Sequence, residues 1–153
     1  MRCWWPTPGA AQAGCLQTDA PCLLGDDDWV VLVPPPQYLR AYSFFVDPTY
    51  GTSTLVVVRR AGSTGFAEVT LECMGPLGGW QPIGSGDRFE YAHLELYRGG
   101  VGTVPACETS QHRASSDEDF GIVVWGTDHA ASYGYPAGGT LRSINEVDVI
   151  PAG

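Results

Sequence analysis

The sequence contains no lysine, so all eight basic residues are arginines, and 17 acidic residues give a formal net charge of −9. An acidic surface repels phosphate backbones, which argues against nucleic acid as a partner. No apolar stretch reaches the roughly 18 residues that a membrane span needs, so no segment is expected to cross a bilayer. Apolar residues at helical spacing with capping signals are also missing, and α-helices are not expected.

The sequence patterns of common catalytic and metal sites are missing too. There is no G-x-S-x-G motif, and Ser85 lies in a Gly-Ser-Gly turn with no helix after it. The three histidines are scattered, and the acidic runs 26–28 and 117–119 lack the alternating order of a calcium loop. Seventeen acids allow many carboxylate pairs for glycoside hydrolysis, but the sequence brings no two together. We therefore expect a protein without catalytic residues, metal or cofactor.

Five cysteines are present, at positions 3, 15, 22, 73 and 107. They contain no C-x-x-C pair, so disulfides are a better interpretation than zinc, and disulfides indicate an oxidising compartment. The first residues nevertheless lack the apolar region of a signal peptide. We therefore expect a fragment or a late translation start, with the partner of Cys3 lying upstream or missing.

Short apolar or alternating runs begin at residue 29, and turns rich in glycine and proline separate them. The candidate runs are residues 29–33, 39–46, 54–59, 66–73, 80–83, 88–98, 120–125, 128–135 and 147–150. About eight short strands at this spacing predict an all-β fold, an antiparallel β-sandwich or jelly-roll-like arrangement. Runs 29–33 and 120–125 are apolar on both faces, so both are predicted to be buried strands.

Residues 1–25 show neither helical nor strand periodicity. We expect an irregular linker or the end of a preceding domain there, and a β-sandwich binding domain over residues 26–153. Removal of residues 1–25 is expected to leave a folded body.

A disulfide between Cys73 and Cys107 is predicted from the strand pattern. Cys73 ends the alternating run 66–73 on the face that carries Val69 and Leu71, and Cys107 lies in the loop after the run 88–98. The alternative is two buried free thiols. Of the remaining cysteines, Cys15 and Cys22 form the expected pair.

Four aromatic side chains are candidates for ligand binding because each lies next to glycine or proline, near expected loops. They are Trp80, Trp125, Tyr133 and Tyr135. Partly exposed aromatic rings stack on sugars or anchor a protein partner. The alternative is that they fill the core of a small β domain.

Several segments occur together in a familiar order. They are residues 31–39 (VLVPPPQYL), 66–73 followed by 79–84 (GWQPIG), 115–116, 120–126 (FGIVVWG) and 132–138 (SYGYPAG). In this order they resemble the N-terminal domain family of IgGFc-binding proteins, especially its bacterial members. The resemblance covers about residues 26–150 and corresponds to the C-terminal part of that domain.

The resemblance implies an extracellular or cell-surface module for binding or adhesion that is β-rich and not an enzyme. Its ligand would be a glycan or a surface or mucus protein, and antibody Fc is not carried over as the ligand. Between residues 126 and 132 the chain is shorter than many members, which puts a ligand-binding loop there in doubt. A structural spacer without its own ligand is the main alternative function, and a carboxylate-dependent hydrolase is a remote one.

Overall fold

The computed structural model describes residues 25, 27–99 and 101–141. Three predictions fall outside this part of the chain: the linker, the Cys15–Cys22 pair and a last strand at residues 147–150. The family resemblance and the described residues agree on an all-β fold.

Nine antiparallel strands form one sheet in the described residues. They are β1 (Leu39–Phe45), β2 (Thr52–Arg60), β3 (Val69–Leu71), β4 (Gly75–Pro76), β5 (Gln81–Pro82), β6 (Phe89–Arg98), β7 (Val101–Gly102), β8 (Gln111–Asp128) and β9 (Ala131–Pro136). Two 3-10 turns, η1 (Pro35–Gln37) and η2 (Pro105–Cys107), are the only helical segments described. No helix in this part of the chain is long and apolar enough to cross a membrane.

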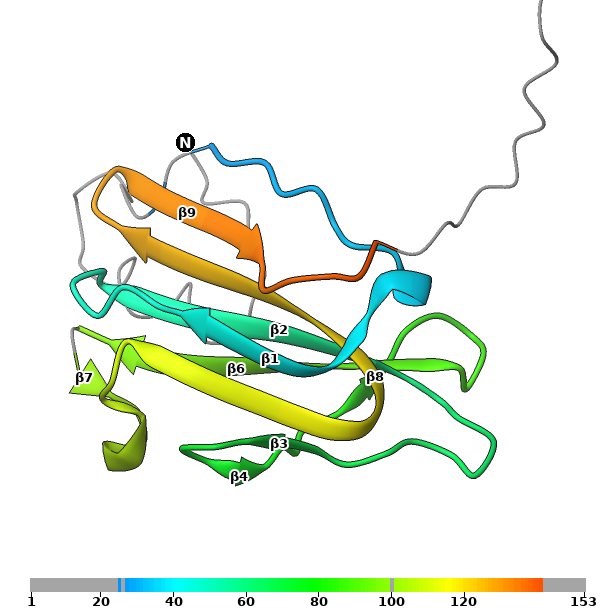
Figure 1. The fold of residues 1–153 in the computed structure, drawn as a ribbon. Coiled ribbons are helices and arrows are strands. Elements are labelled where there is room, and N and C mark those ends of the chain that lie inside the picture. The colour runs from blue at the N-terminus through cyan, green and yellow to red at the C-terminus, as the bar shows by residue number, and fades with distance from the viewer. Residues whose placement is uncertain (1–24, 26, 100, 142–153) are drawn as a thin grey trace, which may run out of the picture.

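The long strand β8 belongs to both halves of the curled sheet (Figure 1). Its first half pairs with β1 and β3, and its second half pairs with β2 and β9. Phe120 marks the change, because it is the register partner of both Leu39 in β1 and Arg59 in β2. The register of β1 shifts between Leu39 and Ala41 at this point, which is the kind of irregularity that bends a strand.

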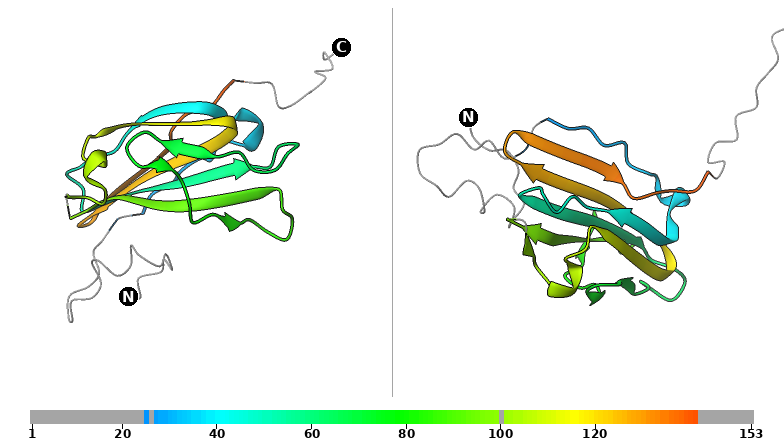
Figure 2. Two further views of the ribbon diagram at one scale, coloured as in Figure 1. Left: turned by 90° about the horizontal axis from the view of Figure 1, so that it is seen from below. Right: turned by 60° about the vertical axis from the view of Figure 1, so that its left-hand side comes forward.

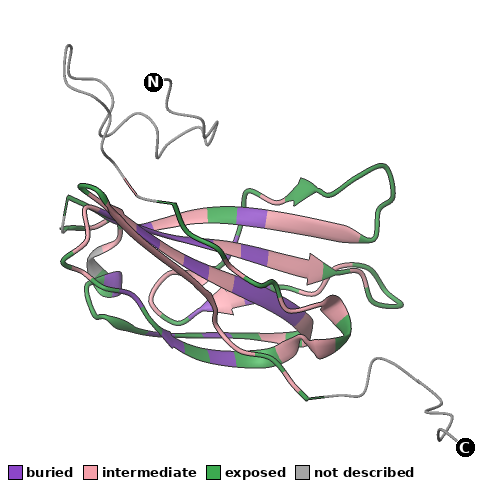
Figure 3. Cartoon of the chain, turned by 90° about the horizontal axis from the view of Figure 1, so that it is seen from above, coloured by how far each residue is buried: buried purple, intermediate pink, exposed green. Residues whose placement is uncertain are grey.

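The core lies between the two halves of the sheet (Figure 3). Buried residues alternate with less buried ones along β1, β3 and most of β8, as the two-residue period of a strand requires. One half contributes Tyr42, Phe44, Val69, Leu71 and Ala114, and the other contributes Leu55, Val57, Leu96, Phe120, Ile122 and Val124. The sandwich predicted from the alternating runs is confirmed, with nine strands rather than eight.

The predicted strand at residues 29–33 is wrong. These residues are not in a strand, and Trp29, Val31 and Leu32 are 93%, 86% and 66% exposed. The segment runs over the outer face of the sheet, where Leu32 lies near Val56 and Val58. Only Val30 and Val33 pack closely on the body, at Gly134 and Gly139, so covering the sheet accounts for these two residues and not for the three exposed ones.

The predicted buried strand at residues 120–125 is confirmed as part of β8. Phe120, Gly121, Ile122 and Val124 are buried there, with β2 on one side and β9 on the other. Gly121 is required because the ring of Tyr38 packs on its backbone: a Cβ at this position would lie 2.5 Å from Tyr38 Cε1.

The predicted disulfide between Cys73 and Cys107 is also confirmed, with the Cα atoms 5.0 Å apart. Cys73 follows β3 and Cys107 ends η2. The bridge therefore ties the turn between β3 and β4 to the connection that leads into β8.

Candidate functional site at the edge of the sandwich

The candidate site lies where the end of β1 faces β9. Both strands pair with β8 on the same side, β1 along its first half and β9 along its second. Because β8 curls, these two strands come to face each other across the open edge of the sandwich (Figure 2). The edge of β1 that does not pair with β8 is therefore turned toward β9.

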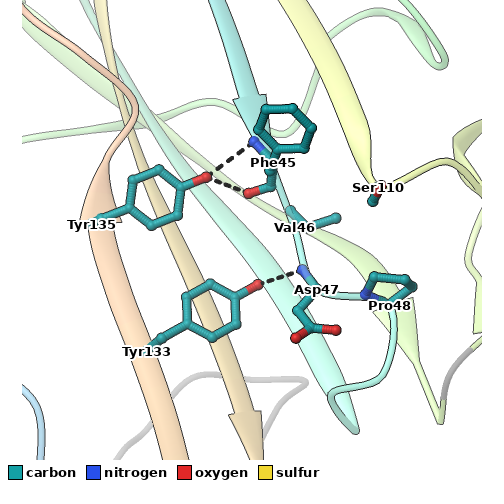
Figure 4. Close-up of a pocket in the computed structure, with 7 residues that line it drawn as sticks. All are labelled: Phe45, Val46, Asp47, Pro48, Ser110, Tyr133 and Tyr135. Carbon is teal, nitrogen blue, oxygen red and sulfur yellow. Dashed lines mark hydrogen bonds between the residues drawn. The ribbon is translucent and has the colours of Figure 1, made fainter.

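Two tyrosines of β9 bridge this edge (Figure 4). The Tyr135 hydroxyl accepts a hydrogen bond from the Phe45 N–H at 3.0 Å and donates one to the Phe45 carbonyl oxygen. The Tyr133 hydroxyl accepts a hydrogen bond from the Asp47 N–H at 2.9 Å. Burial raises the pKa of Tyr135, so its hydroxyl keeps the proton that it donates. The side chains thus satisfy backbone groups that a neighbouring strand would otherwise bind.

The tyrosines share one face of β9 because they are two residues apart. Their rings stack with centroids 6.3 Å apart, and Tyr50 packs edge-on against Tyr133 at 4.9 Å. Tyr133 lies across from Gly126, where a Cβ would come within 2.1 Å of its ring. Glycine at position 126 therefore creates the room for this aromatic pair.

Beside the tyrosines is a shallow, open hollow of about 550 Å³. Its lining residues are Phe45, Val46, Asp47, Pro48, Ser110, Tyr133 and Tyr135. Phe45 stands at the rim with 59% of its surface exposed, whereas Val46 is buried in the core. The hollow is thus mostly apolar and reachable from solvent.

Asp47 brings the one charge of the described lining. Its Oδ1 accepts hydrogen bonds from the Thr49 N–H at 2.9 Å and from the Thr49 hydroxyl at 2.6 Å. These bonds hold the pKa of Asp47 below its ordinary value, so the carboxylate is ionised at neutral pH. The lining can contact an apolar or aromatic group and pair with a cation.

Trp80 lies elsewhere, in a contact that uses both its face and its N–H. The Arg59 guanidinium lies 3.9 Å from the ring centroid, and the indole N–H donates to the Leu77 carbonyl at 2.9 Å. Arg59 also pairs with Glu90 and donates to the Ala67 carbonyl. This Arg59 clamp, comprising Arg59, Trp80, Glu90 and the backbone of Ala67, is built as an internal packing contact.

Trp125 points to the outer face of the sheet rather than toward the hollow. Its ring and the side chain of Val30 both pack on Gly134, where a Cβ would lie 2.6 Å from each. Of the four aromatic candidates, therefore, only Tyr133 and Tyr135 come together. No three metal-binding side chains gather in the described part of the chain either.

Phe45 and Asp47 were not identified from the sequence as site residues. The run 39–46 places Tyr42, Phe44 and Val46 on one parity, which leaves Phe45 as a large aromatic side chain on the solvent parity. An aromatic residue on the outward face of an edge strand was the signal that could have found it. Asp47 looked like an ordinary turn residue.

Comparison with known protein families matches residues 14–126 to the family described as IgGFc binding protein. The match covers more than half of the chain and includes Phe45, Asp47 and Ser110. It ends before β9, so Tyr133, Tyr135 and the motif at residues 132–138 lie beyond it. No curated protein and no solved structure gives a significant match.

Proposed function

The chain belongs to the IgGFc binding protein family, and from this premise we propose that it is an extracellular module that binds a partner through the hollow. The partner class is a glycan or a protein of a cell surface or mucus layer. Exposed Phe45 at the rim of the hollow is the observation that carries the proposal. Aromatic side chains, phenylalanine included, are enriched in the cores of protein interfaces.

The disulfide supports the extracellular part of the proposal. The Cys73–Cys107 bridge requires an oxidising environment to form and persist, as secreted and surface proteins have. The proposal is for binding rather than catalysis, because the lining offers a single carboxylate and hydrolysis of glycosides uses two.

A structural spacer is the second candidate, and a specific observation favours it. The Tyr135 hydroxyl is engaged by the backbone of Phe45 at the end of β1, the Tyr133 hydroxyl by that of Asp47 just after it, and the ring of Trp80 is covered by Arg59. These aromatic side chains already make stabilising contacts within the fold. Under this alternative the hollow is only the seam at which the sandwich closes.

Binding assays with purified, oxidised protein distinguish the two functions. The immobilised protein is tested against a glycan array and a panel of purified extracellular glycoproteins, including mucin and antibody Fc. The binding function predicts at least one partner whose affinity falls about tenfold in Phe45→Ala, as expected for an interface anchor. Ile83→Ala is the matched control, since Ile83 is also exposed but lies beside β5. No partner at all supports the spacer, whereas a partner bound equally well by both variants shows that binding does not use Phe45 and contradicts the hollow as the binding site.

A further inference from the structure

We propose that the hollow recognises an arginine side chain carried on an apolar stretch of a protein partner. This inference rests on the proposed function, because it names the class of partner that the same hollow takes. Three features carry it: the charge of Asp47, the rings around it and a similar contact elsewhere in the molecule.

The charge at the hollow has no ion-pair partner among the described residues. The described ion pairs of the chain use Arg40, Arg59 and Arg98, and none of them involves Asp47. Both hydrogen bonds from Thr49 go to Oδ1, which fixes the carboxylate and leaves Oδ2 without a hydrogen bond from the described residues. The chain as a whole carries a net charge of −9. A cationic group on the partner therefore complements both the hollow and the overall field.

The rings beside Asp47 favour arginine over lysine. Phe45 is exposed at the rim, Tyr133 lies next to the Asp47 carboxylate, and Tyr135 lies farther along the wall beside Phe45 (Figure 4). A planar guanidinium stacks on aromatic faces and directs several N–H donors in its plane, whereas an ammonium group is a strongly hydrated point charge. Ser110, on the far side of the hollow, adds a hydroxyl that can accept one of these donors.

The same chain already contains an arginine held in this way. In the Arg59 clamp, the guanidinium lies 3.9 Å from the Trp80 ring centroid and 5.1 Å from that of Phe66, with Glu90 bound at 2.7 Å. The hollow offers the two halves of this contact, aromatic rings and a carboxylate, but no arginine of its own among the described residues that line it. A partner supplies the missing component.

The negative charge of Asp47 also favours a cationic protein partner over a glycan. A neutral sugar can donate a hydroxyl hydrogen bond to the Asp47 carboxylate but does not neutralise its charge, and an acidic sugar such as a sialic acid is repelled by it and by the net charge. The observations thus favour a protein partner, and sugar binding becomes an outcome of the test.

Titration followed by NMR tests the inference with defined probes. The probes are blocked pentapeptides in which arginine, citrulline or lysine stands between two leucines. The arginine peptide is expected to shift the amide signals of Phe45, Asp47 and Tyr133. The citrulline peptide, which has the same shape without charge, is expected to bind about three- to fivefold more weakly, the range of an exposed ion pair. Asp47→Asn is expected to lower the affinity for the arginine peptide to that of the citrulline peptide.

The matched control is Asp87→Asn, which removes one negative charge from an exposed turn before β6. It is expected to leave the affinity unchanged within the error of the titration. A rise in sodium chloride from about 50 mM to about 300 mM is expected to lower the affinity for the arginine peptide and to leave the affinity for the citrulline peptide unchanged.

The inference is overturned if citrulline binds as well as arginine, if Asp47→Asn has no effect, or if no peptide shifts these signals. It is also overturned if a sugar binds with Phe45-dependent affinity that is insensitive to Asp47→Asn. In these cases a partner whose binding still depends on Phe45 leaves the proposed function standing. Loss of all Phe45-dependent binding contradicts both.

Discussion

At the scale of single residues, His112 is an unusual member of the core. It is 2% exposed, its ring stacks on Phe44, and its Nδ1 lies 3.6 Å from Cys73 Sγ. Its Nε2 has no hydrogen-bond partner among the described residues. Burial lowers the pKa of His112, so the imidazole is neutral in the folded protein at neutral pH.

This burial predicts a loss of stability in mild acid. The unfolded chain protonates His112 near the ordinary pKa of 6.5, whereas the folded protein takes up this proton only at lower pH. Stability from this residue is therefore complete above pH 6.5 and falls as the pH drops, by at most about 1.4 kcal/mol per pH unit.

Urea unfolding of the wild type and His112→Leu at several values between pH 7.5 and 5 measures the effect. The variant is expected to show a flatter dependence on pH. Asp47 does not titrate in this pH range, because the ordinary pKa of its carboxyl is 3.8 and hydrogen bonds from Thr49 lower it further. An identical slope in both proteins would show that His112 is not the group that titrates.

The disulfide is the second feature at this scale. Cys73 and Cys107 are 34 residues apart in sequence, and chain-entropy estimates for such a loop give about 3–4 kcal/mol of stabilisation. The double variant Cys73→Ala/Cys107→Ala is expected to lose this amount in urea unfolding. As a control, reductant should lower the unfolding free energy of the wild type by a similar amount. It should leave that of the double variant unchanged. A reduced protein as stable as the oxidised one would contradict the estimate.

At the scale of elements, the tyrosines of β9 protect the free edge of β1. Tyr135→Phe removes the hydroxyl that binds both backbone groups of Phe45, so we expect a loss of about 1–2 kcal/mol in unfolding free energy. Tyr91→Phe is the control, because that hydroxyl only binds exposed Gln81 and its loss should matter little. Equal stability of the two variants would mean that water replaces the Tyr135 hydroxyl without loss.

The Arg59 clamp predicts a second effect on an element, the end of β2. Arg59→Lys keeps the charge but loses the stacking on Trp80 and the paired donors to Glu90. We expect a decrease of about 1–2 kcal/mol in unfolding free energy. Arg40→Lys, in an exposed ion pair, should change stability by less than about 0.5 kcal/mol. A reversed order of the two variants in a denaturation series would refute the role of the clamp.

Most strands could be predicted from the sequence because their alternation is local. The runs 39–46, 54–59 and 88–98 correspond closely to β1, β2 and β6. The beginning of β8 was harder to recognise, since Gln111 to Asp119 is largely polar and only His112 and Ala114 are buried there. Residues 29–33 misled because apolar character alone does not distinguish a central strand from a segment that covers a sheet.

The candidate site was less predictable than the fold. Tyr133 and Tyr135 were identified as aromatic residues next to glycine or proline. Phe45, the hydrogen-bond partner of Tyr135, is 90 residues away in sequence. Such a contact depends on how β8 curls, and no local pattern encodes that curl. The disulfide was an exception, because strand order alone brought Cys73 and Cys107 together.

At the scale of the whole molecule, the two ends of β2 close the sandwich in different ways. Near its start, the Ser53 hydroxyl bonds the Asp47 carbonyl and the tyrosine-lined hollow lies beside it. About 20 Å farther along, the Arg59 clamp seals the other end. One end is filled by the chain's own arginine, and the other is open to solvent. We therefore expect binding at the open end and stability effects at the sealed one.

Hydrogen–deuterium exchange of the protein with and without a captured extracellular partner tests this claim most directly. The account predicts slower exchange at Phe45–Asp47 and at Tyr133–Tyr135 on binding, with no change around Trp80 and the Arg59 clamp. Protection centred on the clamp, on the segment at residues 29–33, or nowhere in the described chain would contradict it.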